Sequence, residues 1–221
     1  MCIRDSVNSA NGKIDPAPLT ITAKNQSKIY GTTFSFAGTE FTTGTLYSNT
    51  DTVTSVTLTS SGTPASATVG GSPYSIAPSA AAGTGLTNYI ITYVNGSLTV
   101  NPAPLTITAS SATVTYGATA PIIGSGFSGF VNNEGSTVLT TQPMCVTSYV
   151  QGSLVSGSPY PSSCSGAVDG NYTISYVPGT VTVNRAALQI TASSAIVTYG
   201  ATAPIIGSSF SGFVNNEGST V

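Results

Sequence analysis

The chain has 221 residues, of which 7 are acidic, 5 are basic and none is histidine, giving a net charge of −2. Charged side chains make up 5% of it, against roughly 25% in an ordinary soluble protein. Without histidine neither a Ser-His-Asp nor a Cys-His catalytic group can form, and five basic residues are too few to follow a nucleic-acid backbone. We therefore expect no enzyme, no cofactor, no metal site and no nucleic-acid partner.

The first 14 residues differ from the rest of the sequence. Residues 1–6, Met-Cys-Ile-Arg-Asp-Ser, resemble translated adapter sequence and lack the apolar core of a signal peptide. We predict that residues 1–6 are foreign, and that the remainder of residues 1–14 is a remnant of a preceding repeat. Cys2 belongs to this foreign segment, so we assign it no role in the fold. No apolar run in the chain is long enough to cross a membrane as a helix.

Internal repeats organise the remainder of the chain. An opening segment of the type Pro-Leu-Thr-Ile-Thr-Ala occurs three times, at offsets of 86 and 83 residues, and a Tyr-Gly pair follows it at the same offsets. Both complete copies close with Asn-Tyr-x-Ile-x-Tyr-Val-x-Gly. We predict repeat 1 over residues 15–100, repeat 2 over residues 101–183, and a truncated third repeat over residues 184–221, which we call the third segment.

The third segment is nearly a copy of the start of repeat 2. Residues 186–221 differ from residues 103–138 at only 4 of 36 positions. By the 83-residue period, the third segment stops about 45 residues short of a full repeat. We therefore expect the sequence to be a fragment of a longer tandem array.

Each repeat reads as a series of short strands separated by turns. Segments rich in Thr, Val, Ile and Tyr predict the strands of repeat 2, and Asn-Gly and Pro-Gly predict tight turns at residues 94–97 and 177–180. One short helical turn is expected before Leu139. The fold class is mainly β, with tandem small domains that are either immunoglobulin-like sandwiches or β-grasp-like sheets with at most one short helix each. The predicted strands of repeat 2 are Leu105–Ala109, Ala112–Tyr116, Met144–Val150, Tyr172–Tyr176 and Thr180–Val183.

The junction between the repeats contains no flexible linker. Pro102 and Pro104 hold their own and the preceding residues in extended conformations. This favours a stiff string of domains arranged head to tail over domains on a loose tether.

The order of motifs resembles a known family. Pro-Leu-Thr-Ile-Thr-Ala, Tyr-Gly, Ser-Pro-Tyr and the closing Asn-Tyr-x-Ile-x-Tyr-Val follow one another in both complete repeats. This order resembles the bacterial MBG domain of the YGX type and covers about residues 15–221. The resemblance implies tandem arrays in large secreted or surface-anchored bacterial proteins, often adhesin-like, and it supplies no catalytic residues.

Two cysteines lie in repeat 2, 19 residues apart. The segment between Cys145 and Cys164 is rich in turn residues, so the flanking segments can pair as antiparallel strands. We predict a disulfide between them, which suits an exported domain. The alternatives are two free thiols or a metal pair, and the second lacks a histidine or further cysteine to complete a tetrahedral site.

Tyrosines are the main aromatic candidates, because tryptophan is absent. Tyr89 and Tyr93, and in repeat 2 Tyr172 and Tyr176, are four residues apart on a predicted strand and so share a face. Packing in the core with the hydroxyl near the edge is the simpler interpretation. Stacking on a sugar is the functional alternative, with Tyr89 and Tyr172 as the candidate ligand-stacking residues.

The carboxylates are scattered along the chain. A glycosidase needs two converging carboxylates and a calcium loop needs several oxygen donors close together, and neither pattern is visible. We expect Glu134 and Glu217, which occupy the same repeat position, to lie in a solvated loop, with a weak surface cation site as the alternative. The other carboxylates considered are Glu40, Asp51 and Asp169.

These observations favour a structural function. We expect non-catalytic spacer repeats of a secreted or cell-surface bacterial adhesin-like protein, with the export signal outside this sequence. The alternative is a module that binds a glycan or a host surface through exposed tyrosines. Glycans or other cell-surface molecules are the expected partners of the wider protein.

Overall fold

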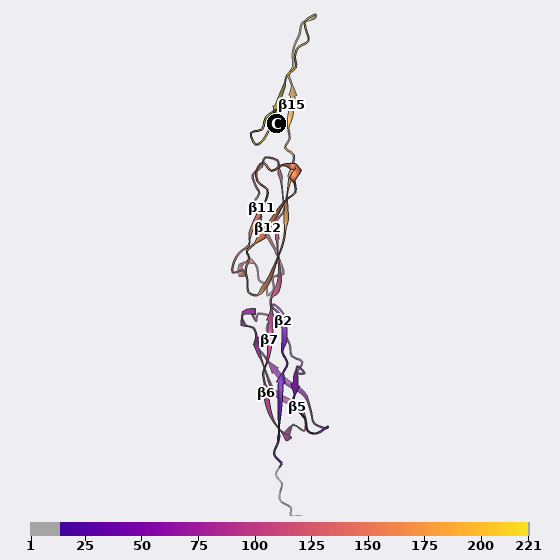
Figure 1. Ribbon diagram of the computed structural model, residues 1–221, viewed down its shortest axis with the longest axis vertical. Coiled ribbons are helices and arrows are strands. Elements are labelled where there is room, and N and C mark those ends of the chain that lie inside the picture. The colour runs from indigo at the N-terminus through magenta and orange to yellow at the C-terminus, as the bar shows by residue number, and fades with distance from the viewer. Residues whose placement is uncertain (1–13, 221) are drawn as a thin grey trace, which may run out of the picture. The chain divides into compact units, whose positions relative to one another are not determined.

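The computed structural model describes residues 14–220, so the predicted foreign segment and Cys2 lie outside the described residues. The chain divides into two compact units, one ending at Ala103 and the other beginning at Pro104. Strands dominate both units (Figure 1). The helical elements of the described residues are four short 3-10 turns, Val69–Gly71, Leu86–Asn88, Ser136–Val138 and Val155–Gly157.

Repeat 1 forms two sheets. The first has the strand order β3-β1-β6, and the second has the order β2-β7-β5-β4. β1 pairs with β6, and β2 with β7, in parallel, so the two closing strands return to the two opening strands. The strands are β1 (Ala17–Ala23), β2 (Gln26–Ile29), β3 (Phe41–Thr43), β4 (Thr52–Thr59), β5 (Tyr74–Thr84), β6 (Tyr89–Val94) and β7 (Gly96–Asn101).

The core of repeat 1 lies between its two sheets. In β1 the side chains of Leu19, Ile21 and Ala23 are buried at every second position, as expected for a strand with one buried face. They pack with Ile76 and Leu98 from the other sheet. The domain is therefore a β-sandwich, which decides between the two predicted architectures: two facing sheets are present where a β-grasp fold would place a helix.

Repeat 2 has the same architecture. Its sheets have the orders β10-β8-β13 and β11-β12-β14-β9, which match those of repeat 1 strand for strand. β9 pairs with β14 in parallel, as β2 does with β7. The strands are β8 (Ala103–Ala109), β9 (Ala112–Thr115), β10 (Ser125–Ser128), β11 (Met144–Thr147), β12 (Tyr160–Ser165), β13 (Tyr172–Val177) and β14 (Gly179–Asn184).

The strands predicted in repeat 2 are confirmed, with shifted ends. β11 ends at Thr147 and not at Val150, since a loop containing the buried Tyr149 follows it. The expected helical turn is also confirmed, as the 3-10 turn Ser136–Val138 immediately before Leu139.

The two predicted tight turns are wrong. A single residue, Asn95 or Pro178, separates the last two strands of each repeat, and these strands belong to different sheets. The chain therefore crosses from one sheet to the other without a hairpin. The glycines are required for close approach: a Cβ on Gly96 would lie 2.6 Å from the carbonyl oxygen of Ala23, and one on Gly179 would lie 2.5 Å from that of Ala109.

The third segment contains one two-stranded ladder, formed by β15 (Gln189–Ala192) and β16 (Ser208–Ser211). Its register matches that of β8 and β10, with Ile190 opposite Phe210 as Ile107 is opposite Phe127. Residues 195–198, the counterpart of β9, form no strand. This follows from pairing, because β9 is held by β14.

Candidate functional site

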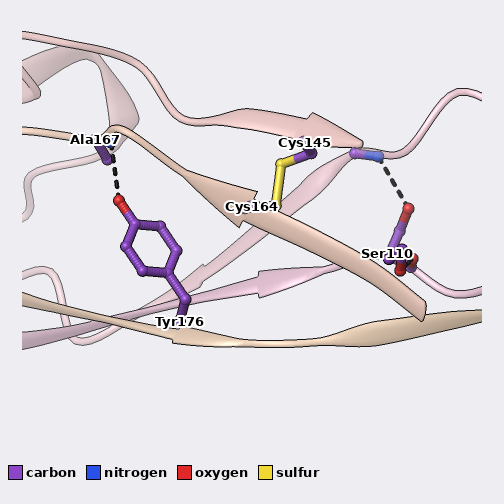
Figure 2. The surroundings of a disulfide bond; sticks show 7 residues. Ser110, Cys145, Cys164, Ala167 and Tyr176 are labelled. Atoms are coloured by element: carbon purple, nitrogen blue, oxygen red, sulfur yellow. Dashed lines mark hydrogen bonds between the residues drawn. A yellow bond between two sulfur atoms is a disulfide. The ribbon is translucent and has the colours of Figure 1, made fainter. Parts of the chain in front are cut away.

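The two predicted cysteines lie opposite each other on neighbouring strands. Cys145 on β11 pairs with Cys164 on β12, with Cα atoms 4.0 Å apart and a disulfide between the sulfurs. Figure 2 shows the bond linking the two strands, with the Tyr176 hydroxyl nearby accepting a hydrogen bond from the Ala167 N–H at 2.8 Å. Cys164 is buried in the core of repeat 2 with Val181, so the bond fastens β11 to the core of the domain.

Tyr89 begins β6 with its ring inside the core of repeat 1. Its hydroxyl donates to the Asp51 carboxylate at 2.7 Å and accepts from the Tyr47 N–H at 2.8 Å. The hydrogen bond to Asp51, with burial as a smaller contribution, raises the pKa of the Tyr89 hydroxyl above its ordinary value. This tyrosine therefore ties the loop before β4 to the sandwich.

Tyr172 has the same function at the start of β13 in repeat 2. Its ring meets Phe130 edge to face, with ring centres 5.5 Å apart. Its hydroxyl donates to the Glu134 carboxylate and accepts from the Val131 N–H at 3.1 Å. The tyrosine thus anchors the loop that carries Glu134 to the core.

The stacking candidates offer no open ring face. Tyr89 is 8% exposed and Tyr172 is 5% exposed. Stacking on a sugar requires an aromatic face in contact with solvent. The structure therefore contradicts the interpretation of Tyr89 and Tyr172 as ligand-stacking residues, because both rings are part of the packing of their own domains.

Glu134 and Glu217 lie in loops, as predicted, but their side chains are less solvated than expected. Both side chains are half-buried. Glu134 accepts from the Tyr172 hydroxyl, and Glu217 accepts from the hydroxyl of Tyr116. The hydrogen bond to Glu217 is the main cause that raises the pKa of Tyr116.

Two other carboxylates also bind backbone groups. The Glu40 carboxylate accepts hydrogen bonds from the N–H groups of Ala37, Gly38 and Thr39 at 2.9–3.1 Å. Burial alone would raise the pKa of Glu40, but these backbone donors outweigh it and hold the pKa below its ordinary value. Asp169 accepts from the Asn171 N–H at 2.7 Å. These bonds tie both carboxylates to backbone groups of their own chain.

Lys28 is a functional side chain of the fold that sequence reasoning missed. It lies on β2, is 7% exposed, and its ammonium donates to the carbonyls of Thr32, at 2.9 Å, and Pro64. Burial lowers its pKa. Comparison of the two repeats could have identified it, because Lys28 occupies the inward-facing position of β2 that corresponds to Val114 of β9 in repeat 2.

The cavities are small. One of about 260 Å³ lies beside Tyr89 and Asp51, and one of about 270 Å³ lies between Tyr116 of repeat 2 and Phe213 of the third segment. Ligand pockets commonly measure roughly 300–1,000 Å³. Residues 14–220 contain no group of three or more potential metal ligands, and no helix among them is long and apolar enough to span a membrane.

The fold and the internal use of its polar groups define a protein of tandem β-sandwich domains. The profile of the MBG domain (YGX type) family matches the chain twice, over residues 19–99 and 105–182. The chain therefore belongs to this family and contains two consecutive copies of its domain. Comparison with curated proteins found no match, and comparison with solved structures found none.

Proposed function

We propose that these domains are non-catalytic spacers in a secreted or cell-surface bacterial protein of the adhesin-like type. The observation that carries the proposal is the internal use of the candidate groups. The stacking candidates Tyr89 and Tyr172 are buried, the carboxylates described above bind hydroxyl or backbone groups of the same chain, and the cysteines are joined. Membership of a tandem-repeat family of surface-type proteins supports the same conclusion.

The disulfide supports an extracellular location. Disulfides persist in oxidising compartments and are rare in the cytosol. The bond between Cys145 and Cys164 lies in a small domain. Small domains bury a smaller fraction of their surface on folding, so a covalent cross-link adds stability that the hydrophobic core does not supply.

The junction between the repeats supports a spacer. Only Pro102 separates the end of β7 at Asn101 from the start of β8 at Ala103. A single residue with a fixed φ angle leaves little freedom for the chain between two strands. A spacer needs a junction with little backbone freedom, because it has to keep successive domains at a fixed separation.

The test is the distribution of distances between spin labels placed on equivalent outward-facing residues, Thr99 of repeat 1 and Thr182 of repeat 2. Both are exposed, so labels there leave the cores unchanged. Replacing Cys2 with serine leaves the two introduced cysteines as the labelling sites. We expect a narrow distribution, and a broader one when a flexible Gly-Ser segment is inserted after Pro102. A distribution that is already as broad in the parent chain would overturn the spacer proposal.

A further inference from the structure

Each complete repeat carries its Tyr-Gly turn at the end where the chain leaves the domain. The Tyr116 N–H donates to the carbonyl of Asn184, the last residue of β14, at 2.8 Å. In repeat 1 the Tyr30 N–H donates in the same way to Asn101, the last residue of β7, at 2.8 Å. The turn therefore lies beside the residue from which the chain passes into the next repeat.

The turn of repeat 2 is held in place from within its own domain. The Tyr149 hydroxyl donates to the Ala118 carbonyl at 2.6 Å, and the Gln151 amide donates to the Gly117 carbonyl at 3.0 Å. The ring of Tyr116 packs against the core of repeat 2. Repeat 2 thus fixes the backbone and the ring of the Tyr-Gly pair, whereas the tyrosine hydroxyl finds its acceptor in the third segment.

A second feature, the loop Phe-Val-Asn-Asn-Glu, lies where the chain enters a domain. We call it the docking loop; it spans residues 130–134 in repeat 2 and residues 213–217 in the third segment. A Cβ on Gly129, just before the loop, would lie 2.4 Å from the carbonyl oxygen of Pro104. In the third segment a Cβ on Gly212 would lie 2.3 Å from that of Ala187. The docking loop therefore begins against the opening residues of its own repeat.

The docking loop has one conformation in both copies. Its two asparagines have φ angles of 54° and 59° in repeat 2, and of 53° and 59° in the third segment. Asparagine adopts this left-handed region more readily than most residues do. The Glu134 N–H donates to the Val131 carbonyl at 2.9 Å, and the Glu217 N–H donates to that of Val214 at 3.0 Å. The sequence of the loop thus fixes the position of its glutamate.

The turn of repeat 2 and the docking loop of the third segment are in contact. The Tyr116 hydroxyl donates to the Glu217 carboxylate and accepts from the side chain of Asn215. A hydrogen bond to an ionised group is stronger than one between neutral groups. Gly117 has a φ of 90°, and a Cβ there would lie 2.7 Å from the Cβ of Val214. Both residues of the Tyr-Gly pair therefore contact the copy that follows.

The carboxylate of the loop takes part in contacts of two kinds. Glu134 accepts from Tyr172 of its own repeat, whereas Glu217 accepts from Tyr116 of the repeat before it, and a carboxylate has lone pairs for two hydroxyls. Repeat 1 has a different loop, in which Asp51 takes the place of the glutamate. Since aspartate is one methylene shorter, the two kinds of loop hold the carboxylate at different distances from the backbone.

We propose that the Tyr-Gly turn of a repeat is a docking element for the loop of the repeat that follows it, with the bond from Tyr116 to Glu217 as its specific contact. The partner is a second copy of the repeat whose loop presents a carboxylate beside a valine. This goes beyond the function of a spacer, because a docking pair also selects which repeat can follow. The spacer proposal is tested between Thr99 and Thr182, so the two can fail independently.

The first experiment measures the distance between spin labels at Thr182 of repeat 2 and Thr191 of the third segment, in the full chain with Cys2→Ser. Both threonines are exposed. We expect a narrow distribution in the parent and a broader one in Tyr116→Phe, which removes the hydroxyl and keeps the ring. Tyr199→Phe is the matched control and should resemble the parent, since this tyrosine has the same repeat position and is fully exposed. A parent distribution as broad as that of Tyr116→Phe would overturn the proposal.

Hydrogen exchange at the amides of residues 214–217 tests the contact itself. Tyr116→Phe should raise exchange there at least about tenfold, because the lost bond joins a hydroxyl to an ionised group. Exchange in β9 and β14 should stay at the parent rate, since the ring remains in the core; a hydroxyl that acted only within repeat 2 would raise it. Adding Glu217→Gln should cause no further increase, because both changes remove one interaction. Unchanged exchange at residues 214–217 in Tyr116→Phe, or additive effects of the two changes, would contradict the docking pair.

Discussion

Lys28 in repeat 1 and Tyr149 in repeat 2 satisfy the same carbonyl position from different places in the sequence. The Lys28 ammonium donates to the Thr32 carbonyl at 2.9 Å, and the Tyr149 hydroxyl donates to the Ala118 carbonyl at 2.6 Å. Thr32 and Ala118 are both the residue after the Tyr-Gly pair. The two repeats thus place a different donor beneath the same turn.

Two sequence positions differ together between the repeats at this site. Where repeat 1 has Lys28 and Thr63, repeat 2 has Val114 and Tyr149. Lys28→Val should lower the free energy of unfolding of repeat 1 by about 2 kcal/mol, because the carbonyls of Thr32 and Pro64 lose a charged hydrogen-bond donor. Adding Thr63→Tyr should recover part of this loss. Hydrogen exchange reports each repeat separately, with repeat 2 as the internal reference. If the double variant is no more stable than Lys28→Val, a tyrosine at position 63 does not replace the lysine as the donor in repeat 1.

The disulfide should stabilise repeat 2 alone. Replacing Cys145 and Cys164 with serine should lower the free energy of unfolding of repeat 2 by about 3 kcal/mol, because the unfolded chain gains the freedom that the closed loop removes. Denaturation followed by hydrogen exchange should show no change in repeat 1, which has no disulfide in the described residues. An equal loss in both repeats would show that the variant acts by another route.

Tyr172 should contribute through both its ring and its hydroxyl. Tyr172→Phe removes the bonds to Glu134 and Val131 and should cost about 1 kcal/mol. Tyr172→Ala also removes the buried ring, at a cost of about 4 kcal/mol. Tyr176→Phe is the matched control, since this tyrosine is 38% exposed and should cost less than either. The measurement is equilibrium unfolding of repeat 2, and equal stability of Tyr172→Phe and the parent would disprove a contribution of the hydroxyl.

Glu40 should make repeat 1 sensitive to acid. The pKa of its carboxyl is lower in the folded state than its ordinary value of 4.5. The unfolded state therefore takes up a proton first, and the stabilisation is complete above pH 4.5 and lost as the pH falls through the folded pKa. Glu40→Gln should lack this part of the pH dependence. Hydrogen exchange at residues 37–39 across this range is the measurement, and identical profiles for parent and variant would exclude the assignment.

The composition and alternation of side chains predicted five of the seven strands of repeat 2, and the two that they missed, β10 and β12, are rich in serine and glycine or proline. Leu105 and Ile107 alternate with threonine, and both are buried in β8 as that pattern requires. The repeat offsets likewise predicted two equivalent domains, because a repeated sequence folds by the same contacts each time.

Local sequence patterns failed to predict the role of a residue whose contacts lie far away in the sequence. Val-Asn-Gly-Ser is typical of a hairpin turn, but Gly96 is required by the approach of the Ala23 carbonyl from another strand. Glu134 reads as a loop residue, and only the fold brings Tyr172 to it across 38 positions. A single sequence contains no direct signal for such pairings.

The parallel pairing of β9 with β14 has a consequence for the order of synthesis. The strands that close repeat 2 are its last two, and β14 is complete at Asn184 before β15 begins at Gln189. A ribosome therefore delivers every strand of one repeat before it delivers the near-identical opening strand of the next, and domains made in this order fold as units. A chain refolding from denaturant has no such protection, since all copies compete at once. Synthesis from the N-terminus therefore favours pairing of strands within one repeat over pairing between repeats.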